Sequence, residues 1–583
     1  MRRTLTIGVA TALAVVLAGC ASSGGTSGGA SNAPSGAASG DAGGGGAAAT
    51  SMTYLGVDVP AGLDPDGPSA AIPAAQQGMA QLMDTLIYYK PKGEDPSGVG
   101  LLDFGYDIPQ FEGRLAESVT FDPESLAWTF KLRQGVIGCG GATFNADDVL
   151  YTFARAKSVS GAAPIGWFLS NVANIGGFTT DVFAEDKAVA DKAKELGDWI
   201  TKTDDYTVVI KQDAPNKLFL PVLTIFGLYI YDAETMEANA TPEDPWSHEY
   251  ANNVNAPSFG PYCIKTWTKD SEMVLEANND YYRGAPAIQN ITWRKVPQSA
   301  NRLASVQTGA AQLTDGLTPK EFASVTGNAD VKQWSVVGNS NMFLGLNFNV
   351  APFDNPKVRQ AIAYALNYDT IIQNGYFGDA VKWEGQVPMT YPGYSKAPTQ
   401  YTYDPEKAKA LLAESGWKDD GSLKLTYVAE KESTLGPIVT QIKADLAAIG
   451  VNVTLDPIPQ TQYGDRMLVK KDLPFFVNDQ EKPIGVDAGY ATLLFFVSSD
   501  KGGLNNMVNY SSATVDDLWA KAKNEGDVAV RNELLAQVQE TLQQDVAWVP
   551  VVQYDTQYLS TPSVSGMVWH PDNAIRFFDL AIG

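Results

Sequence analysis

Cysteine and histidine, the side chains most often used for metal binding and nucleophilic catalysis, are rare in this sequence. Its 583 residues include three cysteines and two histidines, His248 and His570. Two histidines exclude a His-rich metal site and almost exclude a zinc site of Cys and His ligands. Both histidines lie in segments that are typical of loops, and the sequence contains no GxSxG, HExxH or phosphate-loop signature. The sequence therefore predicts a protein that is not an enzyme and that holds no metal or cofactor.

Carboxylates are the one reactive group present in excess. The 66 acidic residues against 42 basic ones give a net charge of −24 and a pI near 4.5. Such a chain lacks the excess of basic residues that is typical of nucleic-acid binding, and an anionic membrane would repel its folded body. Composition alone leaves open a hydrolase that uses two carboxylates, but no positioned pair or nucleophile stands out.

The third cysteine, Cys20, follows a short apolar segment at the start of the chain. A basic start precedes an apolar stretch, residues 7–17, that is too short to remain as a membrane helix. The next residues, LAGC, resemble the lipobox of bacterial lipoproteins, in which the cysteine is lipidated and becomes the first residue. We therefore expect residues 1–19 to be a lipoprotein signal peptide and Cys20 to be lipidated. A plain secretory signal is the alternative.

Residues 20–50 consist almost entirely of Gly, Ala and Ser. Such a segment has too little apolar surface to offset its conformational entropy, so we expect a disordered tether. Each buried methylene of an acyl chain contributes about 0.8 kcal/mol to anchoring. The predicted location is the extracytoplasmic face of the bacterial cell membrane, with the lipid on Cys20 as the anchor.

The elements that would position functional residues can be predicted from hydrophobic spacing. Residues 125–133 alternate strictly between apolar and polar and predict a half-buried strand. The later stretch FNADDVLYTFARA predicts a helix that is capped by Asn145 and has Asp148 in its first turn. Pro356 and Pro405 each follow a capping residue and predict two further helices that begin at proline.

Residues 423–457 follow the order strand, helix, strand. Two alternating segments enclose a helical one, which the pattern predicts to begin at Pro437 and to end at Gly450. A βαβ unit of this kind almost always crosses over right-handed and builds a parallel sheet. Together with a length sufficient for two or three lobes, this predicts the α/β class.

Several segments between about residue 55 and the end of the chain form a recognisable set. They are GLDP, RLAESVTFDPESLAWTFKLRQGV with FNADDVLYTFARA, SFGPYCIKTW, NNDYYRGAPAIQNITWRKVPQSANRLASVQTGAAQL, FNVAPFDNPKVRQAIAYALNYDTII and YTYDPEKAKALLAESGW. Together, and in this order, these segments resemble the extracellular solute-binding protein family 5, the peptide/nickel-type binding proteins of ABC importers.

The resemblance implies a two-lobed periplasmic-binding-protein fold of type II, in the large peptide-binding class, with an extra domain inserted in the N-terminal lobe. It implies that residues 51–82, 245–315 and 548–583 form lobe I, that 83–244 form the inserted domain and that 316–547 form lobe II. The implied function is that of an extracellular receptor of an ABC importer, which captures peptides by lobe closure. Its implied partners are a small-molecule ligand and the permease and ATPase subunits. We expect a monomer that binds no nucleic acid.

In peptide-binding members of this family, an aspartate in a late segment receives the α-ammonium group of the ligand through a charge-assisted hydrogen bond. The corresponding position here is Asp487, in FFVNDQEKPIGVDAGYATLLFF. Tyr490 and Asn478 of the same segment, and Trp383 in KWEGQVPMTYPGY, are further candidates for ligand binding. The segment departs from the family pattern, because Asn478 stands near a usual Trp and Ala488 replaces Pro. The ligand class therefore stays open.

Peptides are the predicted ligands, and oligosaccharides or a nickel–chelate complex are the alternatives. Twelve tryptophans and the altered late segment keep a sugar ligand open. Two histidines form no dedicated nickel site, although a metal carried by an organic chelator would not need one. A purely structural surface lipoprotein is a further alternative, which ligand-induced closure would contradict.

Cys139 and Cys263 are the two cysteines that remain after Cys20. Cys139 lies in Gly-Cys-Gly-Gly, where the family commonly has a different turn. Two leftover cysteines in an oxidising compartment often pair, which makes a disulfide possible. The sequence does not show whether their Cα atoms lie close enough.

Overall fold

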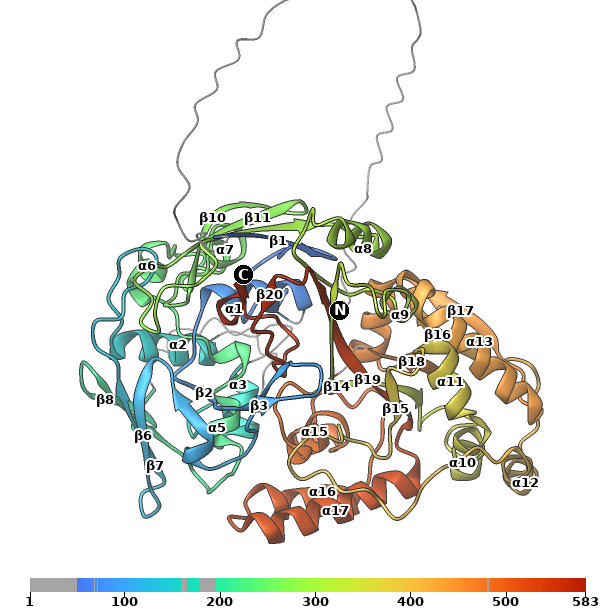
Figure 1. The fold of residues 1–583 in the computed structure, drawn as a ribbon. Coiled ribbons are helices and arrows are strands. Elements are labelled where there is room, and N and C mark those ends of the chain that lie inside the picture. Colours follow the sequence, from blue (N-terminus) through green and yellow to red (C-terminus); the bar gives the residue numbers. More distant parts are fainter. Residues whose placement is uncertain (1–49, 68, 71, 159–164, 179–195, 480–481) are drawn as a thin grey trace, which may run out of the picture. The chain divides into compact units, whose positions relative to one another are not determined.

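The computed structural model describes residues 50–67, 69–70, 72–158, 165–178, 196–479 and 482–583 (Figure 1). The predicted signal peptide, the lipidation site Cys20 and nearly all of the predicted tether lie outside the described residues. Within the described ranges, no helix is both long enough and apolar enough to cross a membrane.

One large mixed sheet runs through the body (Figure 1). Its strands pair in the order β10-β11-β12-β1-β13-β19-β14-β18-β16-β17, and β15 pairs with β19. The bounds are β1 Ser51–Gly56, β10 Tyr262–Thr268, β11 Glu272–Ala277, β12 Asn290–Lys295, β13 Leu313–Asp315, β14 Lys332–Leu346, β15 Ala380–Lys382, β16 Lys424–Val428, β17 Thr454–Ile458, β18 Phe475–Asn478 and β19 Val549–Ser560. The long strands β14 and β19 pair antiparallel in the middle of this order.

Helices lie in many of the connections between these strands. Those of eight residues or more are α1 Pro73–Leu82, α2 Ala146–Ser158, α8 Ser299–Gln307, α10 Pro356–Ala365, α11 Tyr368–Gly375, α12 Pro405–Ser415, α13 Glu432–Ala448, α15 Ala488–Phe495, α16 Ala513–Lys523 and α17 Val528–Asp545. Shorter ones are α3 Ile165–Trp167, α5 Phe219–Val222, α6 Ala233–Ala238, α7 His248–Asn253, α9 Pro319–Ser324 and α14 Gln460–Gly464.

Smaller sheets contain further strands among the described residues. A four-stranded antiparallel sheet has the order β6-β7-β9-β8. Its strands are β6 Ala116–Asp122, β7 Ala127–Leu132, β8 Ile200–Asp204 and β9 Thr207–Lys211. The two-stranded pairs are β2 Ile87–Tyr89 with β5 Phe111–Gly113, β3 Pro91–Glu94 with β4 Gly100–Leu102, and β20 Val564–Ser565 with β21 Ala581–Ile582. The four-stranded sheet lies within the segment predicted as the inserted domain, while the bounds of that domain and of the two lobes stay a prediction.

The predicted βαβ unit is confirmed as β16, α13 and β17, and β16 pairs parallel with both β17 and β18. The start of its helix is wrong in the prediction, because α13 begins at Glu432 and Pro437 lies inside it. Proline inside a helix removes one main-chain hydrogen bond. The buried face of α13, which includes Leu435 on one side of the proline and Ile442 on the other, continues past it and holds the helix together.

The predicted helix starts at Asn145, Pro356 and Pro405 are confirmed. Asn145 Oδ1 accepts a hydrogen bond from the N–H of Asp147, 2.7 Å away, and Asp148 Oδ2 accepts one from the N–H of Asn145, 2.8 Å away. This reciprocal pair satisfies two N–H groups at the start of α2. The helices α10 and α12 begin at Pro356 and Pro405, as predicted.

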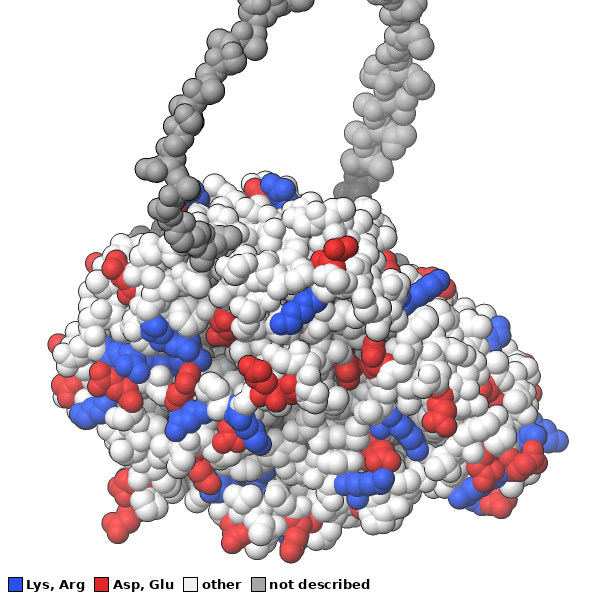
Figure 2. All heavy atoms as spheres, in the orientation of Figure 1, with Lys and Arg blue, Asp and Glu red and all other residues white. Residues whose placement is uncertain are grey.

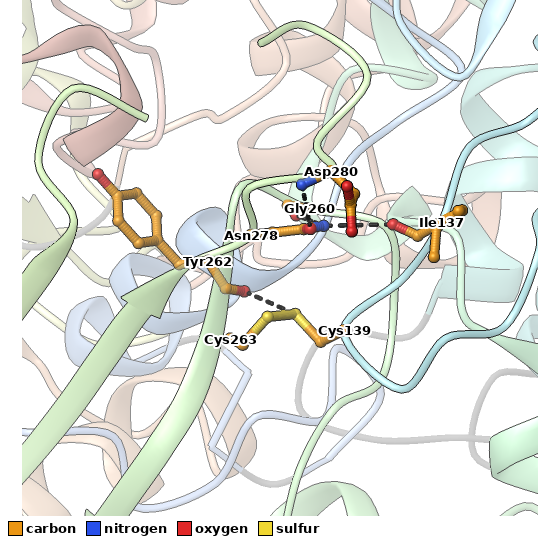
Figure 3. Close-up of a disulfide and its surroundings, with 7 residues drawn as sticks. All are labelled: Ile137, Cys139, Gly260, Tyr262, Cys263, Asn278 and Asp280. Atoms are coloured by element: carbon orange, nitrogen blue, oxygen red, sulfur yellow. Dashed lines mark hydrogen bonds between the residues drawn. A yellow bond between two sulfur atoms is a disulfide. The ribbon is translucent and has the colours of Figure 1, made fainter. Parts of the chain in front are cut away.

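Cys139 and Cys263 form a disulfide whose Cα atoms are 5.6 Å apart (Figure 3). It joins the loop after β7 to the start of β10. The side chain of Asn278 lies beside it and donates hydrogen bonds to the carbonyl oxygens of Ile137 and Gly260, each 3.2 Å away. The disulfide and this amide together attach the segment around residue 139 to the large sheet.

Charged side chains of both signs are interspersed over the face of the body shown in Figure 2. Lys and Arg alternate there with Asp and Glu, without a broad area of one sign on that face. The excess of acidic residues is thus spread out rather than gathered on that face, which is the usual pattern of a solvated surface.

A group of charges, the Arg155 cluster (Arg155, Asp64, Asp66 and His248), joins the N-terminal GLDP stretch to α2 and α7, and all of its members except His248 are buried. The Arg155 guanidinium donates to both oxygens of Asp64, at 2.8 and 2.7 Å, and to Asp66 Oδ2 at 2.9 Å. His248 Nδ1 lies 2.5 Å from Asp64 Oδ2. His248 was predicted to lie in a loop but is the first residue of α7.

His570 is also placed differently from the prediction of a solvated loop residue. It is buried, and its Nδ1 lies 3.1 Å from the Tyr88 hydroxyl while its Nε2 lies 3.0 Å from Asp579. Burial, followed by the charge of Arg576, lowers the pKa of its ring.

Candidate functional site

Segments that are far apart in the chain meet at the Asn339 side chain, in the middle of β14. The register between β14 and β19 shifts between Val337 and Asn341, so the regular ladder is interrupted at this point. The Asn339 amide group donates to the Tyr391 hydroxyl and to Pro571 O, both 2.7 Å away, and to Pro483 O at 3.3 Å. We call this meeting point the central seam and define it by Asn339, Tyr391, Lys482 and Asp572.

Two acceptor oxygens in this part of β14 are unsatisfied. Asn339 and Asn341 are fully buried, and the Oδ1 atom of each has no hydrogen-bond partner among the described residues. Buried polar atoms are nearly always bonded, and an unsatisfied one costs about 1–3 kcal/mol. Oxygens of this kind suit N–H groups of a ligand, because the amide oxygen can only accept.

The rest of the seam carries a hydroxyl and an ammonium group. The Tyr391 hydroxyl donates to Pro483 O, and burial raises the pKa of this hydroxyl, with a further contribution from Asp487. The Lys482 ammonium donates to the main-chain oxygen of Asp572, 3.3 Å away. Burial lowers the pKa of Lys482 to about 8.

The predicted ligand residue Asp487 lies fully buried at the start of α15, where its Oδ1 accepts from the N–H of Tyr490 at 2.8 Å. Arg531 of α17 donates to both carboxylate oxygens, at 2.7 and 2.8 Å, and the Tyr106 hydroxyl donates to Oδ2. We call Arg531, Asp487 and Tyr106 the Arg531 cluster. A ligand ammonium at Asp487 would therefore share or replace existing partners, and this role stays a prediction.

Arg531 was not identified as a functional residue from the sequence, although its spacing in α17 indicates a buried position. It lies four residues before Leu535 and eleven before Leu542 on the buried face of α17. A charged residue at apolar helical spacing must find a buried partner of opposite charge. The spacing could have indicated Arg531, but it could not have indicated Asp487 as the partner.

The other three predicted residues lie in packed surroundings. Trp383 is buried and its Nε1 donates to Val387 O at 2.8 Å. The Asn478 amide lies against the sulfur of Met467, 2.9 Å away, and the ring of Tyr490 stacks near Phe168 at a centroid distance of 6.1 Å. The structure thus brings Tyr490 next to Asp487, whereas Trp383 and Asn478 are held by residues outside the Arg531 cluster.

A metal centre finds no support in the described part of the chain. No group of three or more His, Cys, Asp or Glu side chains there could hold a metal ion.

Comparison with known proteins shows that the chain is similar to members of one family. The model of "Bacterial extracellular solute-binding proteins, family 5 Middle" matches residues 110–501. The glutathione-binding protein GsiB of Escherichia coli (strain K12) is 26% identical over 488 residues, which cover 82% of this chain and 87% of the relative.

Solved structures show the same fold. The Helicobacter pylori periplasmic binding protein DppA in complex with the peptide STSA has a TM-score of 0.74 and 23% identity, with 92% of this chain and 98% of that chain covered. The dipeptide binding protein from Pseudoalteromonas sp. SM9913 in complex with Met-Leu has a TM-score of 0.74 and 20% identity, with 91% and 100% covered. These likenesses confirm the predicted periplasmic-binding-protein fold.

Proposed function

Because this chain belongs to the bacterial extracellular solute-binding proteins of family 5, we propose that it is the extracytoplasmic receptor of an ABC importer and that its ligands are peptides. The match of the family model over residues 110–501 is the observation that carries this proposal. The relatives support the ligand class, since GsiB is named for glutathione and the two solved structures hold peptides.

The central seam supplies the chemistry that peptide capture needs. A peptide presents N–H donors, carbonyl acceptors and charged ends. The unsatisfied oxygens of Asn339 and Asn341 accept from N–H groups, whereas the Lys482 ammonium binds an anionic group. Since residues of the seam come from segments far apart in the chain, one ligand that contacts several of them favours the arrangement in which they are together.

The energy available is sufficient for such a conformational shift. A ligand can shift the equilibrium by no more than its difference in affinity for the two states. A micromolar ligand binds with about 8 kcal/mol, whereas a shift from 1:99 to 99:1 requires about 5.5 kcal/mol.

The predicted lipid on Cys20 completes the proposal. An acylated Cys20 and a flexible tether would retain the receptor beside its permease in the same membrane. Substitution of Cys20 by Ala is expected to release the protein from the membrane fraction. Unchanged membrane association of the Cys20→Ala protein would contradict the anchor.

A thermal-shift screen tests the ligand class. The chain from residue 20 with Cys20→Ala is refolded from denaturant to remove carried-over ligand and is tested against di- to octapeptides, oligosaccharides, and nickel with and without histidine. A ligand at a hundred times its Kd stabilises by about 2.7 kcal/mol. We expect stabilisation by peptides. Stabilisation only by sugars or only by nickel would contradict the peptide assignment and favour that alternative.

A further inference from the structure

The segment predicted as the inserted domain, residues 83–244, meets the segment predicted as lobe II, residues 316–547, through side chains. The four-stranded sheet of the first segment shares no strand with the large sheet in the described ranges. The Tyr106 hydroxyl reaches across instead, because it donates to Asp487 Oδ2 and accepts a hydrogen bond from Arg531 Nη1 at 3.1 Å. Contacts of this kind can form and break in a domain movement that leaves both sheets intact.

Tyr106 is the member of the Arg531 cluster that comes from residues 83–244. The other two members lie in residues 316–547 and pair with each other at 2.7 and 2.8 Å without it. Tyr106 is 7% exposed, so its hydroxyl bonds to an ion pair that is shielded from water. Burial, followed by the charge of Asp487, raises the pKa of Tyr106, and the hydroxyl therefore keeps the proton that it donates.

The loop that carries Tyr106 is fixed to its own segment by one amide side chain. Gln110 Oε1 accepts hydrogen bonds from the N–H groups of Tyr106 and Asp107, at 3.0 and 3.2 Å. Gln110 Nε2 donates to the main-chain oxygen of Phe104 at 3.3 Å. Since the main chain is held on both sides of Tyr106, the hydroxyl moves together with its segment.

Two further hydrogen bonds join the same two segments. Trp167 Nε1 donates to the main-chain oxygen of Gly502 at 3.1 Å, and Asn174 Nδ2 donates to Asn524 Oδ1 at 3.1 Å. Both lie between neutral groups, whereas Tyr106 bonds to an ionised pair. Hydrogen bonds to ionised groups are roughly twice as strong as neutral ones. Among these three contacts, Tyr106 is therefore expected to contribute most.

We propose that Tyr106 is a positioning residue, whose hydroxyl ties residues 83–244 to the Asp487–Arg531 pair when the lobes are closed and thereby sets the affinity of the receptor. The proposal rests on the peptide-binding function. The apparent affinity of a ligand falls in proportion to the fraction of protein in the binding-competent arrangement. The tie thus acts on all peptides alike, without contact between Tyr106 and the ligand.

The variant Tyr106→Phe tests the proposal, because it removes the hydroxyl and keeps the ring. We expect the apparent Kd of the refolded protein for di- to octapeptides to rise about tenfold, measured by calorimetry. The factor should be the same for free and for N-acetylated peptides. An unchanged Kd would overturn the proposal. A gain in affinity for free peptides alone would also overturn it, since the hydroxyl would then compete with the ligand ammonium for Asp487.

Tyr281→Phe is the matched control. Tyr281 is also buried and donates to a carboxylate, that of Asp84 at 2.6 Å, but neither residue lies in residues 316–547. This variant should lose stability and keep the wild-type Kd. Equal rises of Kd in Tyr281→Phe and Tyr106→Phe would overturn the proposal, because lost stability alone would then explain both. Trp167→Phe removes a neutral bond between the two segments and should raise Kd by a smaller factor, which keeps the test available if Tyr106→Phe does not fold.

The distance between the two segments gives a readout that needs no ligand. Nitroxide labels on Glu124→Cys and Lys521→Cys, both at exposed positions, report it by pulsed electron paramagnetic resonance. In the chain from residue 20 with Cys20→Ala, the disulfide leaves no other thiol to label. Without peptide, we expect a smaller short-distance population in Tyr106→Phe than in the wild type. Equal distance distributions would overturn the proposal. If no peptide binds the wild type, the peptide-binding function fails, whereas this comparison still decides the role of Tyr106.

Discussion

Two buried arginines, Arg155 and Arg531, hold distant parts of the chain together but pair with different numbers of carboxylates. Arg531 faces one carboxylate, that of Asp487, together with the Tyr106 hydroxyl. Arg155 faces two carboxylates, those of Asp64 and Asp66. The number of carboxylates per guanidinium therefore distinguishes two clusters whose individual bonds have similar lengths.

The second carboxylate of the Arg155 cluster behaves differently from the first. The paired guanidinium and His248 hold the pKa of Asp64 well below its usual range, despite its burial. Burial and the charge of Asp64 raise the pKa of Asp66 to about 7, although Arg155 opposes this rise. The Asp66 Oδ1 atom also has no partner among the described residues. One guanidinium thus stabilises one ionised carboxylate fully and a second one only in part.

Removal of Arg155 should have the largest effect. Arg155→Met leaves two buried carboxyl groups without their guanidinium partner and is expected to lower the free energy of unfolding by about 4–5 kcal/mol, at the upper end for a broken buried pair. Urea denaturation at pH 7 measures this loss. Arg294→Met is the control, because the Arg294 side chain is 58% exposed and its ion pair with Glu272 lies at the surface. A loss below about 1 kcal/mol in Arg155→Met, in the range of a surface pair, would contradict the comparison.

Asp487→Asn should be the next most destabilising change. The amide retains an oxygen that can cap α15 but leaves Arg531 buried without an anion, so we expect a loss of about 3 kcal/mol. Urea denaturation at pH 7 again measures this loss. An unchanged stability would show that the Asp487–Arg531 pair contributes little.

The same variant tests the predicted ammonium contact. If Asp487 binds the α-ammonium group, the wild type prefers free over N-acetylated peptides and Asp487→Asn loses this preference. Calorimetry with both peptide forms measures the two ratios. An equal preference in both proteins would assign Asp487 to stability alone.

Tyr106→Phe removes the two hydrogen bonds of the Tyr106 hydroxyl, one to Asp487 and one from Arg531, and leaves the ion pair of the cluster intact. A hydrogen bond to a charged group contributes about 1.5–3 kcal/mol, and we expect a loss at the lower end of this range. Tyr403→Phe is the control, since Tyr403 is 46% exposed. Equal stability of the two variants would mean that the Tyr106 hydroxyl does not stabilise the cluster.

Asp66→Asn should have the smallest effect at pH 7, within about 1 kcal/mol, because the amide replaces a carboxyl group that is already partly protonated there. The main effect of Asp66→Asn is expected on the pH dependence of the folding stability. The folded pKa of about 7 exceeds the ordinary value of 3.8, so between these values the native state binds more protons than the unfolded state. This group therefore lowers stability as pH rises from about 4 to 7.

Measurement of the midpoint temperature of unfolding, Tm, between pH 4.5 and 7.5 tests whether stability falls as pH rises. We expect the decline of Tm with rising pH to be smaller in Asp66→Asn than in the wild type. Part of the decline should remain, because burial also raises the pKa of Asp148 to about 7. Asp500→Asn, at an exposed position, is the control. Identical pH profiles for Asp66→Asn and the wild type would contradict the unequal roles of the two carboxylates.

Local patterns in the sequence determined much of the fold. Asn145, Pro356 and Pro405 mark helix starts because a cap or a proline acts on residues within one turn. The βαβ order of residues 423–457 and the family segments likewise follow from short stretches. The error at Pro437 arose because the buried face of α13 outweighs the local preference of proline for a first turn.

The candidate site depended on the tertiary structure. Asn339 bonds to Pro483, 144 residues away, and to Pro571, 232 residues away. The sequence indicated Asp487 by family resemblance, but not that Arg531 and Tyr106 bind its carboxylate. It contained Asp572 without any sign that its carboxylate pairs with Arg576. Composition and short-range spacing thus determined the class and the caps, and the resemblance of short segments indicated the family. The contacts at the seam arise between residues that only the folded chain path brings together.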